Sequence, residues 1–176
     1  MSFANSVSES NGPATGREKT LVVGLGNPIL GDDGIGWCVA QEVKRRAPDA
    51  EVECLALGGL SLMERLIGYD RAVIIDAIQT SEQRTGTVRI FPLAEMADRT
   101  AGHMTAAHDT SLQTALELGR QMGARLPVAI TVVAIEADRV YDFSEELSPA
   151  VAAAVPAATA AVLAALADIE ELRKTI

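Results

Sequence analysis

Short apolar runs alternate with helical segments along this chain, and that alternation constrains the fold more than any other feature of the sequence. The apolar run at 21–25 leads through a glycine-rich turn into residues 35–46, whose apolar positions recur at the spacing of one helix face. Strands that alternate with helices indicate a parallel sheet covered by helices on both faces. The expected fold is therefore α/β, a three-layer α/β/α sandwich with a twisted sheet of about five strands.

The other elements are predicted from the same two periodicities. Further strands are expected at 51–57, 72–78, 87–91 and 128–135, and further helices at 60–67, at 109–122 and from Ser148 onward. Ser148 is expected to cap the last helix, with Pro149 in its first turn and Pro156 kinking or restarting it.

One connection breaks the alternation. Only a few polar residues, 79–85, separate the strand at 72–78 from Gly86 and the next strand, whereas a parallel crossover needs about a dozen residues or more. The strand at 87–91 is therefore expected to run antiparallel to the strand at 72–78. The predicted sheet is mixed, mostly parallel with one antiparallel strand.

Length and composition indicate one globular domain. The chain has 176 residues, 48% of them hydrophobic and 22% charged, which predicts a single domain over 19–176. Residues 1–18 are rich in Ser, Asn and Gly and lack the apolar stretch of a signal peptide, so they are expected to form a disordered tail. The uncharged stretch at 147–167 is mostly alanine, and we expect it to pack against the sheet rather than span a membrane.

The charge and the cysteine count narrow the possible partners and the compartment. A net charge of -9 disfavours nucleic acid, because binding phosphates needs clustered cations. Two Cys cannot form an all-cysteine zinc site or a disulfide framework, so a reduced cytoplasmic setting is expected. We expect neither a nucleic-acid nor a membrane partner.

Polar residues at the carboxyl ends of the predicted strands are the candidates for chemistry, because ligands bind open α/β sheets there. Asp33 follows the first strand, Asp76 lies near the end of the strand at 72–78, and His108 precedes a helix. Two carboxylates and one imidazole make an open ligand set that suits zinc, nickel or cobalt. By composition His103 is an equal candidate, and Asp32 is interpreted equally well as a helix cap.

The turn GLGNPILGDDGIG at 24–36 does not predict a nucleotide site. Ile29 occupies the third glycine position of a GxGxxG motif, no Lys follows, and two carboxylates at a helix start would repel phosphate.

Cys38 and Cys54 are expected to be buried as small hydrophobes, and no serine lies in a GxSxG elbow. Glu136, at the end of a strand, is expected to have a structural role.

Four segments together resemble the [NiFe]-hydrogenase maturation endopeptidases, in the order of that family and over most of residues 20–168. They are LVVGLGNPILGDDGIG at 21–36, AVIIDAI at 72–78, HDTSLQTALELG at 108–119 and AIEADRVYDFSEELSPAV at 134–151. The resemblance implies an endopeptidase that removes a carboxy-terminal peptide from the precursor of a hydrogenase large subunit after nickel insertion. It also implies a mixed sheet flanked by helices, nickel supplied by the substrate as the recognition signal, and no organic cofactor.

The resemblance implies that Asp33, Asp76 and His108 contact the nickel, and it favours His108 over His103 because of the helix that follows. Two departures concern substrate recognition: Ala106-Ala107 stands where the family often has Ser or Thr and Pro, and Gly58-Gly59-Leu60 replaces a common Gly-Gly-Thr turn.

Two other functions stay open. A module that only binds nickel or the precursor, without cleaving it, would fit the absence of an evident nucleophile. LVVGLGNP also resembles the start of bacterial peptidyl-tRNA hydrolases, but the Tyr and the His-Asn pair that follow in that family are missing here.

Overall fold

The computed structural model describes residues 18–80, 84–96, 107–138 and 143–174, without the side chains of 107–111 and 169–174. The tail predicted at 1–18 lies almost entirely outside the described residues. The elements are β1 (Thr20–Leu25), η1 (Gly31–Gly34), α1 (Ile35–Arg46), β2 (Glu51–Leu55), α2 (Gly59–Arg65), β3 (Arg71–Ile78), β4 (Val88–Pro92), η2 (Leu93–Glu95), α4 (Ala107–Gln121), β5 (Ala129–Glu136) and α5 (Pro149–Lys174).

The five strands form one mixed sheet in the order β2-β1-β3-β5-β4. The pairs β1–β2, β1–β3 and β3–β5 are parallel, and β4 pairs antiparallel with β5. The predicted antiparallel strand is thus confirmed. It is antiparallel because the short connection after β3 leaves no room for a crossover helix, and it lies at the edge of the sheet beside β5.

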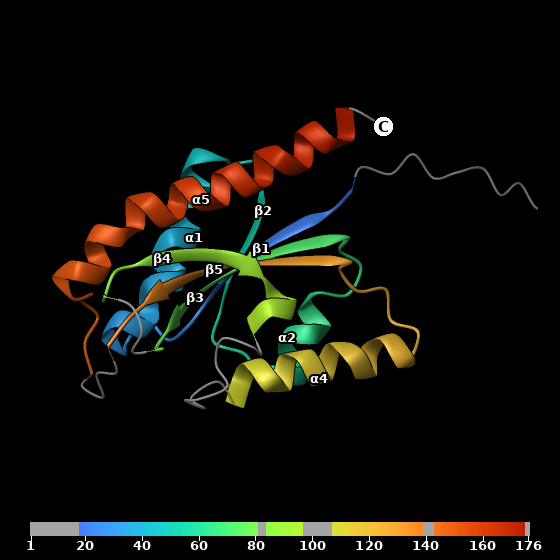
Figure 1. The fold of residues 1–176 in the computed structure, drawn as a ribbon, viewed down its shortest axis with the longest axis horizontal. Coiled ribbons are helices and arrows are strands. Elements are labelled where there is room, and N and C mark those ends of the chain that lie inside the picture. Colours follow the sequence, from blue (N-terminus) through green and yellow to red (C-terminus); the bar gives the residue numbers. More distant parts are fainter. Residues whose placement is uncertain (1–17, 81–83, 97–106, 139–142, 175–176) are drawn as a thin grey trace, which may run out of the picture.

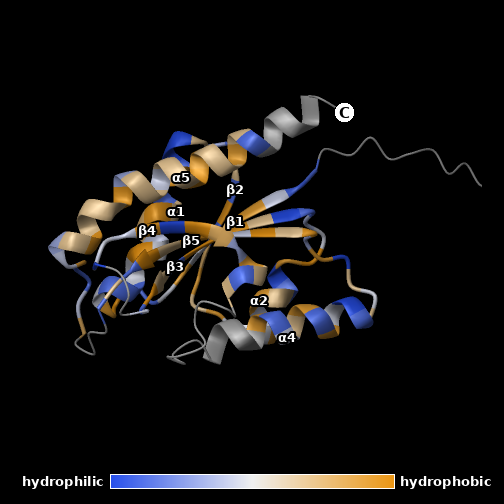
Figure 2. Ribbon diagram, viewed as in Figure 1, coloured by the Kyte–Doolittle hydropathy of each residue, from blue (hydrophilic) through white to orange (hydrophobic). Residues whose placement is uncertain are grey.

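Helices cover both faces of the sheet, as predicted, and each face has its own core (Figure 1). Along β3, Val73 and Ile75 pack with α1 and α5, whereas Ala72 and Ile74 pack with α2 and α4. Successive side chains of a strand point to opposite faces, so a strand buried on both faces must be apolar throughout. Figure 2 shows this apolar character along the strands, with polar residues on the outward side of α4.

Helix α5 lies on the α1 side of the sheet and contacts α1, β4 and β5. It buries Val151, Ala154, Ala158 and Val162 against the core, as expected for an alanine-rich helix. By length and composition Pro149–Asp168 would also be long and apolar enough to cross a membrane. Within this window 28% of the helix is buried, and its buried positions pack against the sheet.

The structure tests two details predicted for α5. The helix runs without interruption through Pro156, so it does not restart there. The carbonyl of Ser148 accepts the first helical hydrogen bond, from Ala152, but the Ser148 hydroxyl has no hydrogen-bond partner among the described residues and does not cap the helix. Near Pro156, the buried hydroxyl of Thr159 donates to the carbonyl of Val155 at 2.8 Å.

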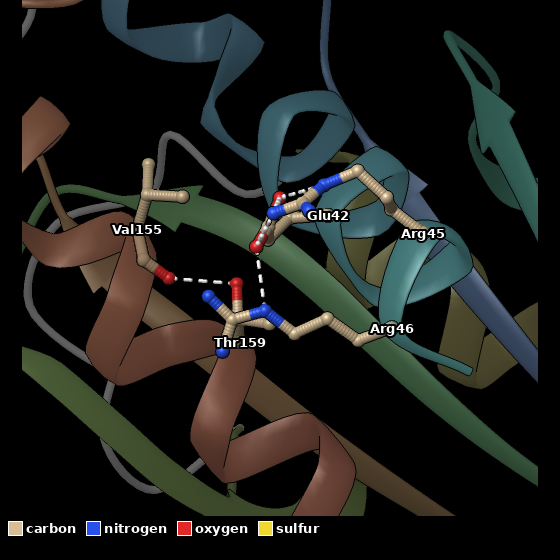
Figure 3. A network of polar contacts seen from close by, with 5 residues as sticks. All are labelled: Glu42, Arg45, Arg46, Val155 and Thr159. Carbon is tan, nitrogen blue, oxygen red and sulfur yellow. Dashed lines mark hydrogen bonds and ion pairs between the residues drawn. The ribbon is translucent and has the colours of Figure 1, made fainter.

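The basic residues in the last turn of α1 form hydrogen bonds within the domain. Arg45 and Arg46 both donate to Glu42 one turn earlier, as Figure 3 shows beside Thr159 of α5. Lys44 donates through Nζ to the carbonyls of Pro48 and Ala50, each at 2.8 Å. These cations lie at the carboxyl end of the helix, where positive charge is stabilising.

The amino ends of β1 and β5 are tied together by Asp70. Its carboxylate accepts the Lys19 N–H at 2.8 Å and a hydrogen bond from Arg125, while its backbone bonds to Lys19 and Val128. The hydrogen bond from Arg125, and then that from Lys19, lowers the pKa of this carboxyl. Asp70 therefore stabilises the fold in its charged form.

We predict that Asp70→Ala lowers the free energy of unfolding by about 1–2 kcal/mol at neutral pH. Because the pKa of Asp70 is lowered in the folded state, its contribution is complete above the ordinary value of 3.8 and disappears as the pH falls through the lowered value. Urea unfolding of both proteins should show a difference that narrows below about pH 4. A difference that stays constant down to about pH 2 would contradict this assignment.

Candidate active site at the carboxyl edge of the sheet

Asp33 lies in the loop between β1 and α1, on the short helix η1, and its side chain is exposed. Its Oδ2 accepts the backbone N–H of Asn27 at 2.6 Å. Gly26 has a φ of 122°, and a Cβ at that position would lie 1.8 Å from the Asp33 carbonyl oxygen. The chain can therefore fold back on itself here only because residue 26 is a glycine.

Gly36 brings this loop to the ends of β1 and β3. A Cβ on Gly36 would lie 2.1 Å from the carbonyl oxygen of Leu25 and 2.6 Å from that of Ile75. The start of α1 thus presses directly on the ends of both strands, and η1 contacts β3. Since Asp76 follows Ile75, the structure brings the elements that carry Asp33 and Asp76 together at one edge.

Asp76 is half-buried near the end of β3. Its neighbours Ile75 and Ala77 pack on the α1–α5 side, while Ile74 and Ile78 pack on the α2–α4 side. By strand alternation, Asp76 therefore belongs to the face that α2 and α4 cover.

His108 is the second residue of α4. A loop joins the other end of α4 to the start of β5, so the helix runs back along the sheet and begins at the carboxyl edge. The side chain of His108 and the whole of His103 lie outside the described parts of the structure, and the assignment of the imidazole to the site stays a prediction. Among the side chains that are described, no three His, Cys, Asp or Glu residues are close enough to hold a metal ion.

Asp32 has a different role from its neighbour. It is buried, and its Oδ1 accepts the N–H of Ser148 at 2.6 Å. Neither η1 nor α1 has a side-chain cap. Interpreting Asp32 as a cap of its own helix was thus wrong, because its carboxylate serves the beginning of α5, which is distant in sequence.

Glu136 is buried at the end of β5 and accepts hydrogen bonds from the backbone N–H and the hydroxyl of Thr80, at 2.6 and 2.9 Å. The same residue bonds through its backbone to Gly86 and Thr87. Glu136 thus joins the segments that follow β3 and precede β4, which supports the expected structural role.

The prediction of buried cysteines is wrong for Cys38, whereas Cys54 packs against the core on the α1–α5 side. Cys38 is exposed and Cys54 is only half-buried, so neither is a fully buried core residue. Cys38 lies between the core-facing positions Gly36 and Val39 of α1. Desolvation raises the pKa of both thiols, which leaves them protonated at neutral pH and unsuited to act as nucleophiles.

Comparison with known proteins decides the family. A family model described as hydrogenase maturation protease matches residues 37–165, which include Asp76 and His108. The chain belongs to the hydrogenase maturation protease family. This family consists of endopeptidases that process the precursors of hydrogenase large subunits.

Individual relatives agree with this assignment. The hydrogenase expression/formation protein HupD of Rhodobacter capsulatus is 27% identical over 143 residues, which cover 80% of this chain and 67% of HupD. The hydrogenase maturating endopeptidase HybD of E. coli is 28% identical, with a TM-score of 0.70 over 85% of this chain and 93% of that structure. The [NiFe] hydrogenase maturation protease HybD of Thermococcus kodakarensis is 27% identical, with a TM-score of 0.64 over 82% and 96% of the two chains.

We predict that Gly26→Ala in this maturation protease lowers precursor processing at least about tenfold, because the new Cβ must displace the Asp33 backbone. Gly68→Ala is the matched control. Gly68 also has a positive φ, of 89°, but a Cβ there meets nothing within 4 Å. Both changes carry backbone strain of about 1–3 kcal/mol, so thermal unfolding should show a loss in both. Equal processing by the two variants would contradict the role given to Gly26.

Proposed function

We propose that this protease removes the carboxy-terminal peptide of a [NiFe]-hydrogenase large-subunit precursor after nickel insertion, with the substrate's nickel as the recognition signal. Asp33, Asp76 and His108 are the residues proposed to contact that nickel. The proposal depends chiefly on one observation: η1 contacts β3, so the elements carrying Asp33 and Asp76 meet at the carboxyl edge.

The chemistry of the donors supports this role. Carboxylate and imidazole bind borderline divalent metals, and three such ligands leave positions for ligands that belong to the substrate. One oxygen of Asp33 accepts the Asn27 N–H, whereas the other has no hydrogen-bond partner among the described residues. A metal held in this way can polarise the scissile carbonyl or lower the pKa of a water molecule.

The surroundings suit a polypeptide substrate. Ile29, Leu57 and Leu60 follow β1 and β2 on the same edge as Asp33, and they are 45%, 43% and 53% exposed. Leu60 takes the place of the threonine common in the family. Exposed apolar side chains around a polar site can bind the side chains of a peptide chain that crosses it.

Efficient cleavage should require nickel in the precursor and all three proposed ligands. Purified protease is incubated with nickel-loaded and with nickel-free precursor, and loss of the carboxy-terminal peptide is followed by mass spectrometry. We expect the loaded form to be cleaved about 100-fold faster or more than the nickel-free form, and losses of about 100-fold or more on the loaded form for Asp33→Asn, Asp76→Asn and His108→Ala. His103→Ala is the control and should process normally.

Each other result has a definite meaning. Binding of the loaded precursor without cleavage would favour a module that only holds nickel or the precursor. Normal cleavage by the Asp33, Asp76 or His108 variant would refute its place in the site, and a large loss in His103→Ala would show that the other histidine is the ligand.

We also predict that Leu60→Asp raises KM for the loaded precursor about tenfold with little change in kcat, because it places a charge on the apolar part of the edge. Val128→Asp is the control. Val128 is 86% exposed, but it precedes β5 at the opposite edge of the sheet. Equal KM values for the two variants would show that the precursor does not use Leu60.

A further inference from the structure

Asp32 is a buried carboxylate whose partner belongs to a distant part of the chain. It is 5% exposed, and within the described residues it bonds to the backbone N–H of Ser148 rather than to a cation. Burying an ionised group is costly unless it is hydrogen-bonded. The Asp32 carboxylate therefore depends on a hydrogen-bond donor that lies 116 residues away in the sequence.

This contact is the last of a series between the Asp33 loop and residues 144–148. The N–H of Ser144 donates to the Ile29 carbonyl at 3.1 Å, and the N–H of Gly31 donates to the Ser144 carbonyl at 2.6 Å. Leu30 and Ser144 form a parallel β-bridge. Residues 29–31 are thus paired with Ser144, and Asp32 with Ser148.

The amino terminus of α5 also stabilises the Asp32 carboxylate electrostatically. Ser148 immediately precedes the helix, and its carbonyl accepts the first helical hydrogen bond. The amino terminus of a helix carries partial positive charge, so the Asp32 carboxylate is held there by its charge as well as by its lone pair.

We propose that Asp32 is a positioning residue: by fastening η1 to the amino terminus of α5, it holds the adjacent Asp33 toward the nickel of the substrate. The inference rests on the function proposed above. Asp32 and Asp33 share a short helix of four residues, in which the Asp33 N–H donates to the Leu30 carbonyl at 3.3 Å. Movement of one aspartate must therefore move the other.

A purely structural role of Asp32 would predict a different result. If Asp32 only stabilised α5, its loss would lower stability but leave the preference for nickel-loaded precursor unchanged. If Asp32 positions Asp33, its loss should reduce that preference in protein that is still folded, because a displacement of about 1 Å at a reacting site can cost about 100-fold in rate.

The test uses the full chain and compares kcat/KM on nickel-loaded and nickel-free precursor, at a temperature where circular dichroism shows every variant folded. Asp32→Ala should lower kcat/KM on the loaded precursor about 10- to 100-fold and reduce the ratio between the two precursors. Asp32→Asn keeps an oxygen that accepts the Ser148 N–H, and should stay within about threefold of the wild type.

Ser148→Pro removes the N–H from the other side of the contact and should reproduce the loss seen in Asp32→Ala. If Asp32→Ala does not fold, this variant and Asp32→Asn provide the comparison. Asp70→Ala is the matched control, since Asp70 also accepts a backbone N–H, at 2.8 Å, but at the opposite edge of the sheet. It should lose stability and keep the wild-type ratio.

Three results would overturn the inference: a normal ratio in folded Asp32→Ala, a normal ratio in Ser148→Pro, or an Asp32→Asn variant as impaired as Asp32→Ala. Failure of the wild type to cleave the loaded precursor is a separate outcome. It would refute the proposed function itself, and it is read from the wild-type reaction before any variant is compared.

Discussion

The approach of Gly36 to the carbonyl oxygens of Leu25 and Ile75 is the constraint on which the rest of the site depends. A side chain at this position would overlap both oxygens, so only a glycine allows α1 to begin directly against the ends of β1 and β3. That contact fixes the direction in which the preceding turn leaves the sheet. It places η1, with Asp33, against the strand that carries Asp76.

Two adjacent aspartates have opposite environments in this turn. Asp33 is exposed and is oriented by the Asn27 N–H, whereas Asp32 is buried against the beginning of α5. The difference follows from the geometry of a short helix, in which consecutive side chains point in different directions. One acid can thus meet a substrate while its neighbour fastens the loop to the domain.

The order of the elements could be predicted from the sequence because local rules determine it. Apolar runs with helical segments between them produced the strands and helices close to their observed bounds, and the short link after β3 was sufficient to predict an antiparallel β4. The family resemblance was carried by local motifs, and the match of a maturation protease model to residues 37–165 confirms it. The exposure of Cys38 was not predicted, because a residue at the border of a helical apolar face can lie on either side of it.

The sequence by itself determined which residues are available for chemistry: few histidines and cysteines, a pair of acids after β1 and one acid near the end of β3. Only the tertiary structure decided how the buried acids are used. Asp32 bonds to Ser148 and Glu136 to Thr80, across separations of 116 and 56 residues. Sequence periodicity reports which face of an element is buried, but the hydrogen-bond partner of a buried carboxylate depends on how distant elements pack together.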